Sequence, residues 1–229
     1  MSTFDVFGHA LNDYLIGNDD TELILHNSYG DLEHMPVSVF FREPEDFTEL
    51  EQLAIDQCQG RTLDIGAGTG AITVVIQEKL DVAALELSRD ACDIAGHLGV
   101  KDVINENIWK FSGQSFDTLF MIMNGLGIAG KLRYLEPFLI HLRTLLRPGG
   151  QILLDSSDLT YMHPDFKSAP ELGEISYQYE YKGQKDPWFN WLYVGEKVLN
   201  QYALKAGLKM EILYRSNDDQ YLARLTPQG

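Results

Sequence analysis

The sequence predicts an α/β fold in which helices cover both faces of a mostly parallel sheet. From residue 61 onward, short apolar segments alternate with helix-patterned segments, which is the order of βαβ units. The segment at 116–123 is apolar almost throughout, as is typical of a central parallel strand. The last two predicted strands are separated only by the turn at 216–219, which is too short for a crossover helix, so they must be antiparallel neighbours.

Length and composition are those of a protein with one sizeable core. The chain has 229 residues, of which 45% are hydrophobic. No stretch reaches about 18 apolar residues, and the N-terminus lacks the positive region of a secretory signal. We therefore expect a cytoplasmic protein with no membrane segment. Cys58 and Cys92 are the only cysteines and the six histidines show no ligand spacing, so we expect no metal site.

The net charge of −16 is concentrated in residues 1–60, where Arg42 is the only lysine or arginine. Such a surface repels phosphate backbones, which argues against a nucleic-acid substrate. The acidic segment is either a solvated face that keeps the protein soluble or a surface that attracts a cationic small molecule or partner. We expect residues 1–60 to form an N-terminal helical or lid extension, with helices at 3–16 and 45–58 and an irregular segment at 17–44.

Residues 61–229 are expected to form the main domain. Predicted strands lie at 61–65, 81–86, 102–105, 116–123 and 151–155. Predicted helices lie at 70–80, 89–97 and 132–146. Ser88 can cap the second of these helices, and Pro148-Gly149-Gly150 ends the third.

After Asp155 the alternation breaks. We expect a loop at 156–173, a hairpin-like insertion at 174–194, a helix at 195–206, and strands at 207–214 and 219–225. The insertion is dense in Tyr, Trp and Phe. These rings either pack the hairpin on the core or close over a small acceptor, and a cationic amine would suit both them and the acidic segment.

The segment LDIGAGTG at 63–70 connects the first strand of this domain to its first helix. The glycines at alternate positions remove every Cβ from the turn, so a ligand can approach the backbone and the helix N-terminus. Glu86 ends the second strand, where a carboxylate can accept hydrogen bonds from both hydroxyls of a ribose. The turn alone is compatible with a purely structural role, but together these features predict a ligand with an adenosine-like part.

These residues resemble the class I S-adenosylmethionine-dependent methyltransferase superfamily. The resemblance covers about residues 61–226 and is carried by four segments: LDIGAGTG at 63–70, ALELS at 84–88, FDTLFMIMN at 116–124 and LLRPGGQILLD at 145–155. It implies a seven-stranded, mostly parallel Rossmann-like sheet with an antiparallel final strand. It also implies in-line methyl transfer from S-adenosyl-L-methionine to an acceptor, expected to be a small molecule, with S-adenosyl-L-homocysteine as product.

The resemblance further implies which residues bind the cofactor. Those expected along its methionine part are Gly66, Ala67, Gly68, Gly70, Asp64 at the ammonium, and Asn124 near the transferred methyl. Those expected at its nucleoside are Glu86 on the ribose, Leu87 and Ile108 on the two adenine faces, and Asn107 at the adenine amino group. The family often has an acid at the last position, but an amide oxygen can accept the same hydrogen bond.

Arg42 has two interpretations: an ion pair with a neighbouring acid, or binding of the cofactor carboxylate from an N-terminal lid. A general base is needed only if the acceptor holds its proton near neutral pH. Candidates are His163, Tyr161 and Asp158, which all follow the fifth predicted strand, although a lone histidine in a loop is more often solvated.

Two alternatives stay open at this point. A nicotinamide-dependent oxidoreductase would fit the loose fingerprint Gly66-x-Gly68-x-x-Ala71 followed by Glu86. The third glycine at 70 and the antiparallel final pair argue against it. The fold could also bind cofactor as an interaction protein without turnover.

Overall fold

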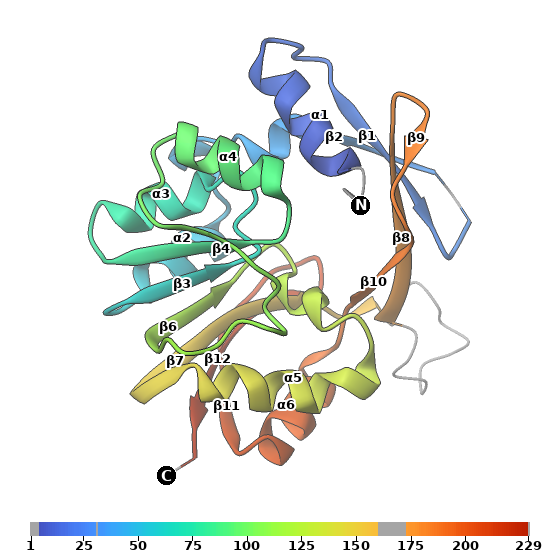
Figure 1. Ribbon diagram of the computed structural model, residues 1–229. Coiled ribbons are helices and arrows are strands. Elements are labelled where there is room, and N and C mark those ends of the chain that lie inside the picture. Colours follow the sequence, from blue (N-terminus) through green and yellow to red (C-terminus); the bar gives the residue numbers. More distant parts are fainter. Residues whose placement is uncertain (1–4, 31, 160–172, 229) are drawn as a thin grey trace.

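The computed structural model describes residues 5–30, 32–159 and 173–228, and its larger sheet has the predicted architecture (Figure 1). Seven strands lie in the order β11-β12-β7-β6-β3-β4-β5. Strands β3 to β7 are parallel, while β12 pairs antiparallel with both β7 and β11. The short turn between β11 and β12 therefore joins antiparallel neighbours, as its length predicts. The strands of this sheet are β3 (Thr62–Ile65), β4 (Val82–Glu86), β5 (Val103–Asn105), β6 (Phe116–Met121), β7 (Leu146–Ser157), β11 (Leu208–Arg215) and β12 (Gln220–Pro227).

Helices cover both faces of the larger sheet. The α-helices are α1 (Val6–Leu15), α2 (Glu49–Asp56), α3 (Ala71–Gln77), α4 (Arg89–His97), α5 (Leu132–Thr144) and α6 (Glu196–Lys205). Short 3₁₀ turns lie at η1 (Val37–Phe40), η2 (Pro44–Asp46) and η3 (Gly125–Ala129). Ser88 caps α4 as predicted, because its hydroxyl accepts the amide hydrogen of Ala91 at 3.0 Å.

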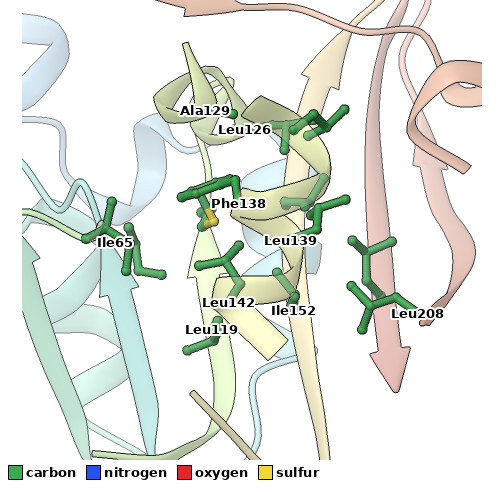
Figure 2. Close-up of a cluster of buried hydrophobic side chains, with 14 of the residues drawn as sticks. Ile65, Leu119, Leu126, Ala129, Phe138, Leu139, Leu142, Ile152 and Leu208 are labelled. Carbon is green, nitrogen blue, oxygen red and sulfur yellow. The ribbon is translucent and has the colours of Figure 1, made fainter. Parts of the chain in front are cut away.

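Successive residues of the central strand β6 point to opposite faces and so enter different cores. Leu119 packs with the buried stripe of α5, which includes Phe138 and Leu142 (Figure 2). Phe120 instead packs with Leu50 of α2 and other residues of the opposite core. Burial on both faces explains why this segment is apolar almost throughout.

A second sheet was not expected from the sequence. Its strands are β1 (Glu22–Asn27), β2 (Glu33–Pro36), β8 (Glu174–Tyr181), β9 (Gln184–Lys185) and β10 (Phe189–Leu192). They lie in the order β10-β8-β1-β2, with β9 on β8. The prediction of an irregular segment at 17–44 was wrong, because β1 and β2 form a hairpin there. Strand β1 gains its partner β8 from about 150 residues away, with Leu25 opposite Tyr179.

The second sheet and α1 form a layer at one end of the larger sheet (Figure 1). The inner face of the small sheet packs on Val6 and Leu11 of α1 and on Ile94 of α4. Asp5, which caps α1, also accepts the Ser88 hydroxyl at 2.5 Å, directly after β4. Strands from residues 22–36 and 174–192 thus belong to one sheet, and the start of α1 contacts the loop after β4.

No helix among the described residues is long and apolar enough to cross a membrane. Within the same ranges, no group of three or more His, Cys, Asp or Glu is arranged to hold a metal ion.

Candidate functional site

The turn between β3 and α3 has the open backbone that its glycines predict. Gly66, Gly68 and Gly70 have φ of 77°, 57° and 79°, in the left-handed region that favours glycine. A Cβ at Gly68 would have no neighbour closer than the Phe40 ring at 3.9 Å, so a ligand has room over this residue. At Gly66 a Cβ would lie 3.0 Å from the side chain of Ile128.

Gly70 has a different reason for being glycine. A Cβ there would lie 2.4 Å from Val100 and 3.3 Å from Ala95, so its missing side chain lets α3 pack closely on the neighbouring α4–β5 segment. Its expected contact with the methionine part of the cofactor stays a prediction.

The Glu86 carboxylate faces the glycine turn from the end of β4. Its Oε2 accepts the Gly68 amide hydrogen at 2.9 Å, and its Oε1 accepts those of Leu87 and Ser88 at 2.7 and 2.8 Å. Burial raises the pKa of Glu86, and these three hydrogen bonds oppose that effect. Because carboxylate oxygens have further lone pairs, this arrangement fits a ribose diol beside the turn.

The adenine-side candidates follow Glu86 directly or lie after β5, the strand that pairs with β4. Leu87 is 67% exposed although it is apolar, which leaves its side chain available to a flat ring. Asn105 ties the ends of β4 and β5 together by donating to the carbonyls of Glu86 and Leu87 at 3.0 and 2.9 Å. Asn107 accepts the Trp109 amide hydrogen at 2.9 Å through the oxygen expected to bind adenine, and that oxygen keeps a second lone pair. Ile108 is buried in the main core.

Asp64 lies under the turn at the end of β3 and is buried. The Thr73 hydroxyl donates to its Oδ2 at 2.6 Å. Burial raises the pKa of Asp64 to about 7, and the nearby charge of Glu86 adds to this effect. A ligand ammonium beside Asp64 would favour its ionised form, so the residue fits its expected role.

Asn124 stands in a strained turn after β6. Met123 and Asn124 have φ of 67° and 54°, a left-handed pair without glycine. Asp155, which is fully buried at the end of β7, accepts the amide hydrogens of Asn124 and Gly125 at 2.8 and 3.0 Å. Gln220 donates to the same carboxylate at 2.7 Å, and burial raises the pKa of Asp155 to about 6. Such strain persists only where neighbours hold it and is concentrated at functional sites.

The second sheet is anchored on this strained turn. Trp191 of β10 donates its indole hydrogen to the Asn124 carbonyl at 3.1 Å, and Ser157 donates to the Asn124 side chain at 2.8 Å. A Cβ at Gly127 would lie 1.9 Å from the Trp191 nitrogen, so this glycine permits the close approach.

Arg42 forms the ion pair that was one of its two interpretations. Its guanidinium donates to both carboxylate oxygens of Glu51 at 2.9 and 2.6 Å and to the Val39 carbonyl at 3.0 Å. Burial alone would raise the pKa of Glu51, but the hydrogen bonds from Arg42 and Thr48 lower it. The guanidinium also lies 3.5 Å from the Met123 sulfur. Arg42 is thus at the rim of the site, and its binding of a cofactor carboxylate stays a prediction.

Of the general-base candidates, Tyr161 and His163 lie outside the described residues. Asp158 is described, and its backbone amide donates to the Asp219 carbonyl at 3.0 Å. The sequence interpretation gave Asp155 no role in the site and included Trp191 only as one of the aromatic residues of the insertion. The position of Asp155 at the end of the predicted fifth strand could have indicated a site residue. The contact of Trp191 with Asn124 joins segments that are distant in the sequence, so no local pattern indicates it.

A pocket of about 380 Å³ adjoins the turn through Ile128. Its lining consists of Trp109, Ile128, Ala129, Gly130, Lys131, Tyr134 and Asn190.

Comparison with known proteins agrees with this geometry. A family model described as a methyltransferase domain matches residues 63–154. The chain is 34% identical to an S-adenosylmethionine-dependent methyltransferase from Bacteroides fragilis, solved in complex with S-adenosyl-L-homocysteine. That match covers 100% of this chain and 97% of the other, with a TM-score of 0.93.

More distant structures share the fold. PH0226 from Pyrococcus horikoshii is 17% identical, with a TM-score of 0.60 over 78% of this chain and 88% of that one. CalS10, an amino pentose methyltransferase from Micromonospora echinaspora, is 16% identical, with a TM-score of 0.56 over 80% of this chain and 93% of that one. No curated protein sequence matches the chain. The identity over the full length shows that the chain belongs to the class I S-adenosylmethionine-dependent methyltransferases.

Proposed function

We propose that this enzyme methylates a small molecule held between the glycine turn and the inner face of the second sheet. The observation that carries the proposal is the hydrogen bond from Trp191 to the Asn124 carbonyl. It joins the inner face of the second sheet to the strand end where the family brings the methyl group. The cofactor side and the second sheet therefore meet at one place.

S-adenosylmethionine, when bound, supplies an electrophilic methyl group on a sulfonium. We assign its methionine part to Gly66, Ala67, Gly68 and Gly70 with Asp64, its ribose to Glu86, and its adenine to Leu87, Asn107 and Ile108. Arg42 is the candidate for its carboxylate, and Asn124 for the region of the transferred methyl. The main work of the chain is to align the acceptor with the methyl group and to exclude water.

Aromatic rings gather between α1 and the inner face of the second sheet, and in this proposal they border the acceptor. Phe7 packs edge-on against Phe40, at 5.0 Å between ring centroids, and stacks on Tyr179 at 5.7 Å. Tyr179 in turn lies 5.0 Å from Phe189. Aromatic faces attract organic cations, and the net charge of −16 favours the same class, so a cationic acceptor belongs to the proposal. His163 and Tyr161 are kept as general-base candidates.

Residues 1–60 serve in this proposal as a lid over the cofactor. The Thr69 hydroxyl of the turn donates to the Phe40 carbonyl, and Ser88 after β4 donates to Asp5. Two separate points of the extension thus contact the two elements expected to hold the nucleoside and the methionine.

The test is to incubate the enzyme with S-adenosylmethionine labelled on its methyl group and a fractionated cell extract. Label is expected in compounds that pass an ultrafiltration membrane. Label found only in protein or nucleic acid would contradict the proposal. The matched control is Glu86→Gln, which should give weaker labelling than wild type in every fraction when S-adenosylmethionine is limiting.

A further inference from the structure

Glu33, a carboxylate on the inner face of the second sheet, has no cationic partner among the residues that the structure describes. Glu33 of β2 is half-buried, and its Oε1 accepts the side-chain amide of Asn27 at 2.8 Å and the Tyr29 hydroxyl. Within the described ranges, no lysine, arginine or histidine forms an ion pair with Glu33. Other acids of the same sheet are paired, since Glu180 contacts His26 and Lys185.

Three tyrosine hydroxyls gather beside Glu33. The Tyr177 hydroxyl lies 3.4 Å from that of Tyr193 and interacts with that of Tyr29. Burial and the hydrogen bond to Glu33 raise the pKa of Tyr29 to about 12. Burial also raises the pKa values of Tyr177 and Tyr193, and the negative charge of Glu33 adds to both. All three hydroxyls are therefore neutral at physiological pH and bring no charge of their own to the surroundings of Glu33.

This cluster is connected to the site of methyl transfer. Tyr193 lies two residues beyond Trp191, which donates to Asn124. The charge of Asp155 also raises the pKa of Tyr193. The opposite end of the cluster reaches the protein surface, because Tyr29 is 38% exposed and Leu32 is 57% exposed. A small molecule that contacts Glu33 would therefore lie at the exposed end of a cluster of which another member, Tyr193, is two residues from Trp191.

We infer that Glu33, with Tyr29, Tyr177 and Tyr193 around it, binds a protonated amine of the methyl acceptor and so selects small organic ammonium compounds. The inference rests on the proposed function. Glu33 accepts hydrogen bonds from Asn27 and Tyr29, and a ligand ammonium would add a cation that no described lysine, arginine or histidine places there. Neutral phenols complete the site with hydroxyl oxygens that accept further N–H hydrogens and with ring faces that attract the charge. An anionic analogue would be repelled by Glu33 and Asp155 together.

The experiment uses the full chain saturated with S-adenosyl-L-homocysteine and three probes of one skeleton: 2-phenylethylammonium, 2-phenylethanol and phenylacetate. Titration calorimetry gives each Kd for wild type, Glu33→Gln and Tyr29→Phe. The matched control is Glu22→Gln, which removes an exposed acid from the same hairpin, one that is paired with His34. The ammonium probe is expected to bind most tightly, about tenfold more weakly to Glu33→Gln, and unchanged to Glu22→Gln. Tyr29→Phe should show a smaller loss in the same direction.

The inference is overturned if the ammonium probe does not bind, if it binds no better than the alcohol, or if Glu33→Gln keeps its affinity. Binding of S-adenosyl-L-homocysteine separates the two levels of the account. If that product binds normally and the preference for ammonium is absent, only the assignment of Glu33 fails. If the product does not bind the wild type, the proposed function fails with it.

Discussion

The Oε2 atom of Glu86 lies 2.9 Å from the amide nitrogen of Gly68, across the open turn between β3 and α3. The Glu86 carboxylate and the glycine backbone therefore border the same region, where we expect the cofactor to bind. In Glu86→Gln the side chain keeps its size but loses its charge, and its amide nitrogen opposes a backbone N–H. We expect the Kd for S-adenosyl-L-homocysteine to rise at least about tenfold.

The control for Glu86 is the exposed neighbour Glu106, whose Gln variant should bind like wild type in the same calorimetric titration. Equal affinity of Glu86→Gln and wild type would remove Glu86 from the cofactor site.

Asp64 predicts how cofactor binding depends on pH. Its pKa in the free protein is about 7, so below that pH the carboxyl is protonated. An ammonium beside it requires the ionised form, so binding below pH 7 must release a proton. Affinity for S-adenosyl-L-homocysteine should therefore fall as the pH falls below 7, by at most about tenfold per unit.

Asp64→Asn should bind more weakly and lose this pH dependence, as measured by titrations between pH 5 and pH 8. A wild-type affinity that stays constant over that range would show that Asp64 does not ionise on binding.

The buried carboxylate of Asp155 holds the left-handed turn at Met123 and Asn124. In Asp155→Asn one of the two amide hydrogens that it accepts would face a side-chain N–H instead. We expect the free energy of unfolding in urea to fall by about 2 kcal/mol. The exposed Asp93→Asn variant is the control and should keep wild-type stability. A loss that does not exceed the control's would mean that the turn needs no such support.

Removing the Arg42 guanidinium should lower the free energy of unfolding, whether or not Arg42 also contacts the cofactor. Arg42→Ala would leave Glu51, which is only 4% exposed, without its cation, so the loss in unfolding free energy should be about 3 kcal/mol. The pair of exposed Arg215 and half-buried Glu196 has similar two-point geometry, and Arg215→Ala should cost much less. Urea denaturation compares the two variants, and equal losses would contradict the role assigned to burial.

The alternation of strands and helices from 61 to 155 could be predicted because each element has its own local signal. Strand β6 is apolar on both faces, α5 has an apolar stripe, and Ser88 begins α4 with a cap. The hairpin at β1 and β2 could not be predicted in the same way. Its residues contain several polar side chains, and its stability comes from pairing with β8, far along the chain.

The same distinction applies to the site. Gly68 and Glu86 belong to local motifs, so their arrangement could be expected before the structure was seen. The indole of Trp191 and the carboxylate of Glu33 reach their places only because the second sheet packs over the first. Periodicity within a segment carries no information about which distant segment will lie beside it.

The most direct test of the account is a crystal structure of the protein with S-adenosyl-L-homocysteine. We predict that the two ribose hydroxyls lie within hydrogen-bonding distance of the Glu86 carboxylate, with the homocysteine part over Gly66 and Gly68. A nucleoside bound away from Glu86, with the glycine turn covered by the protein's own side chains, would contradict it.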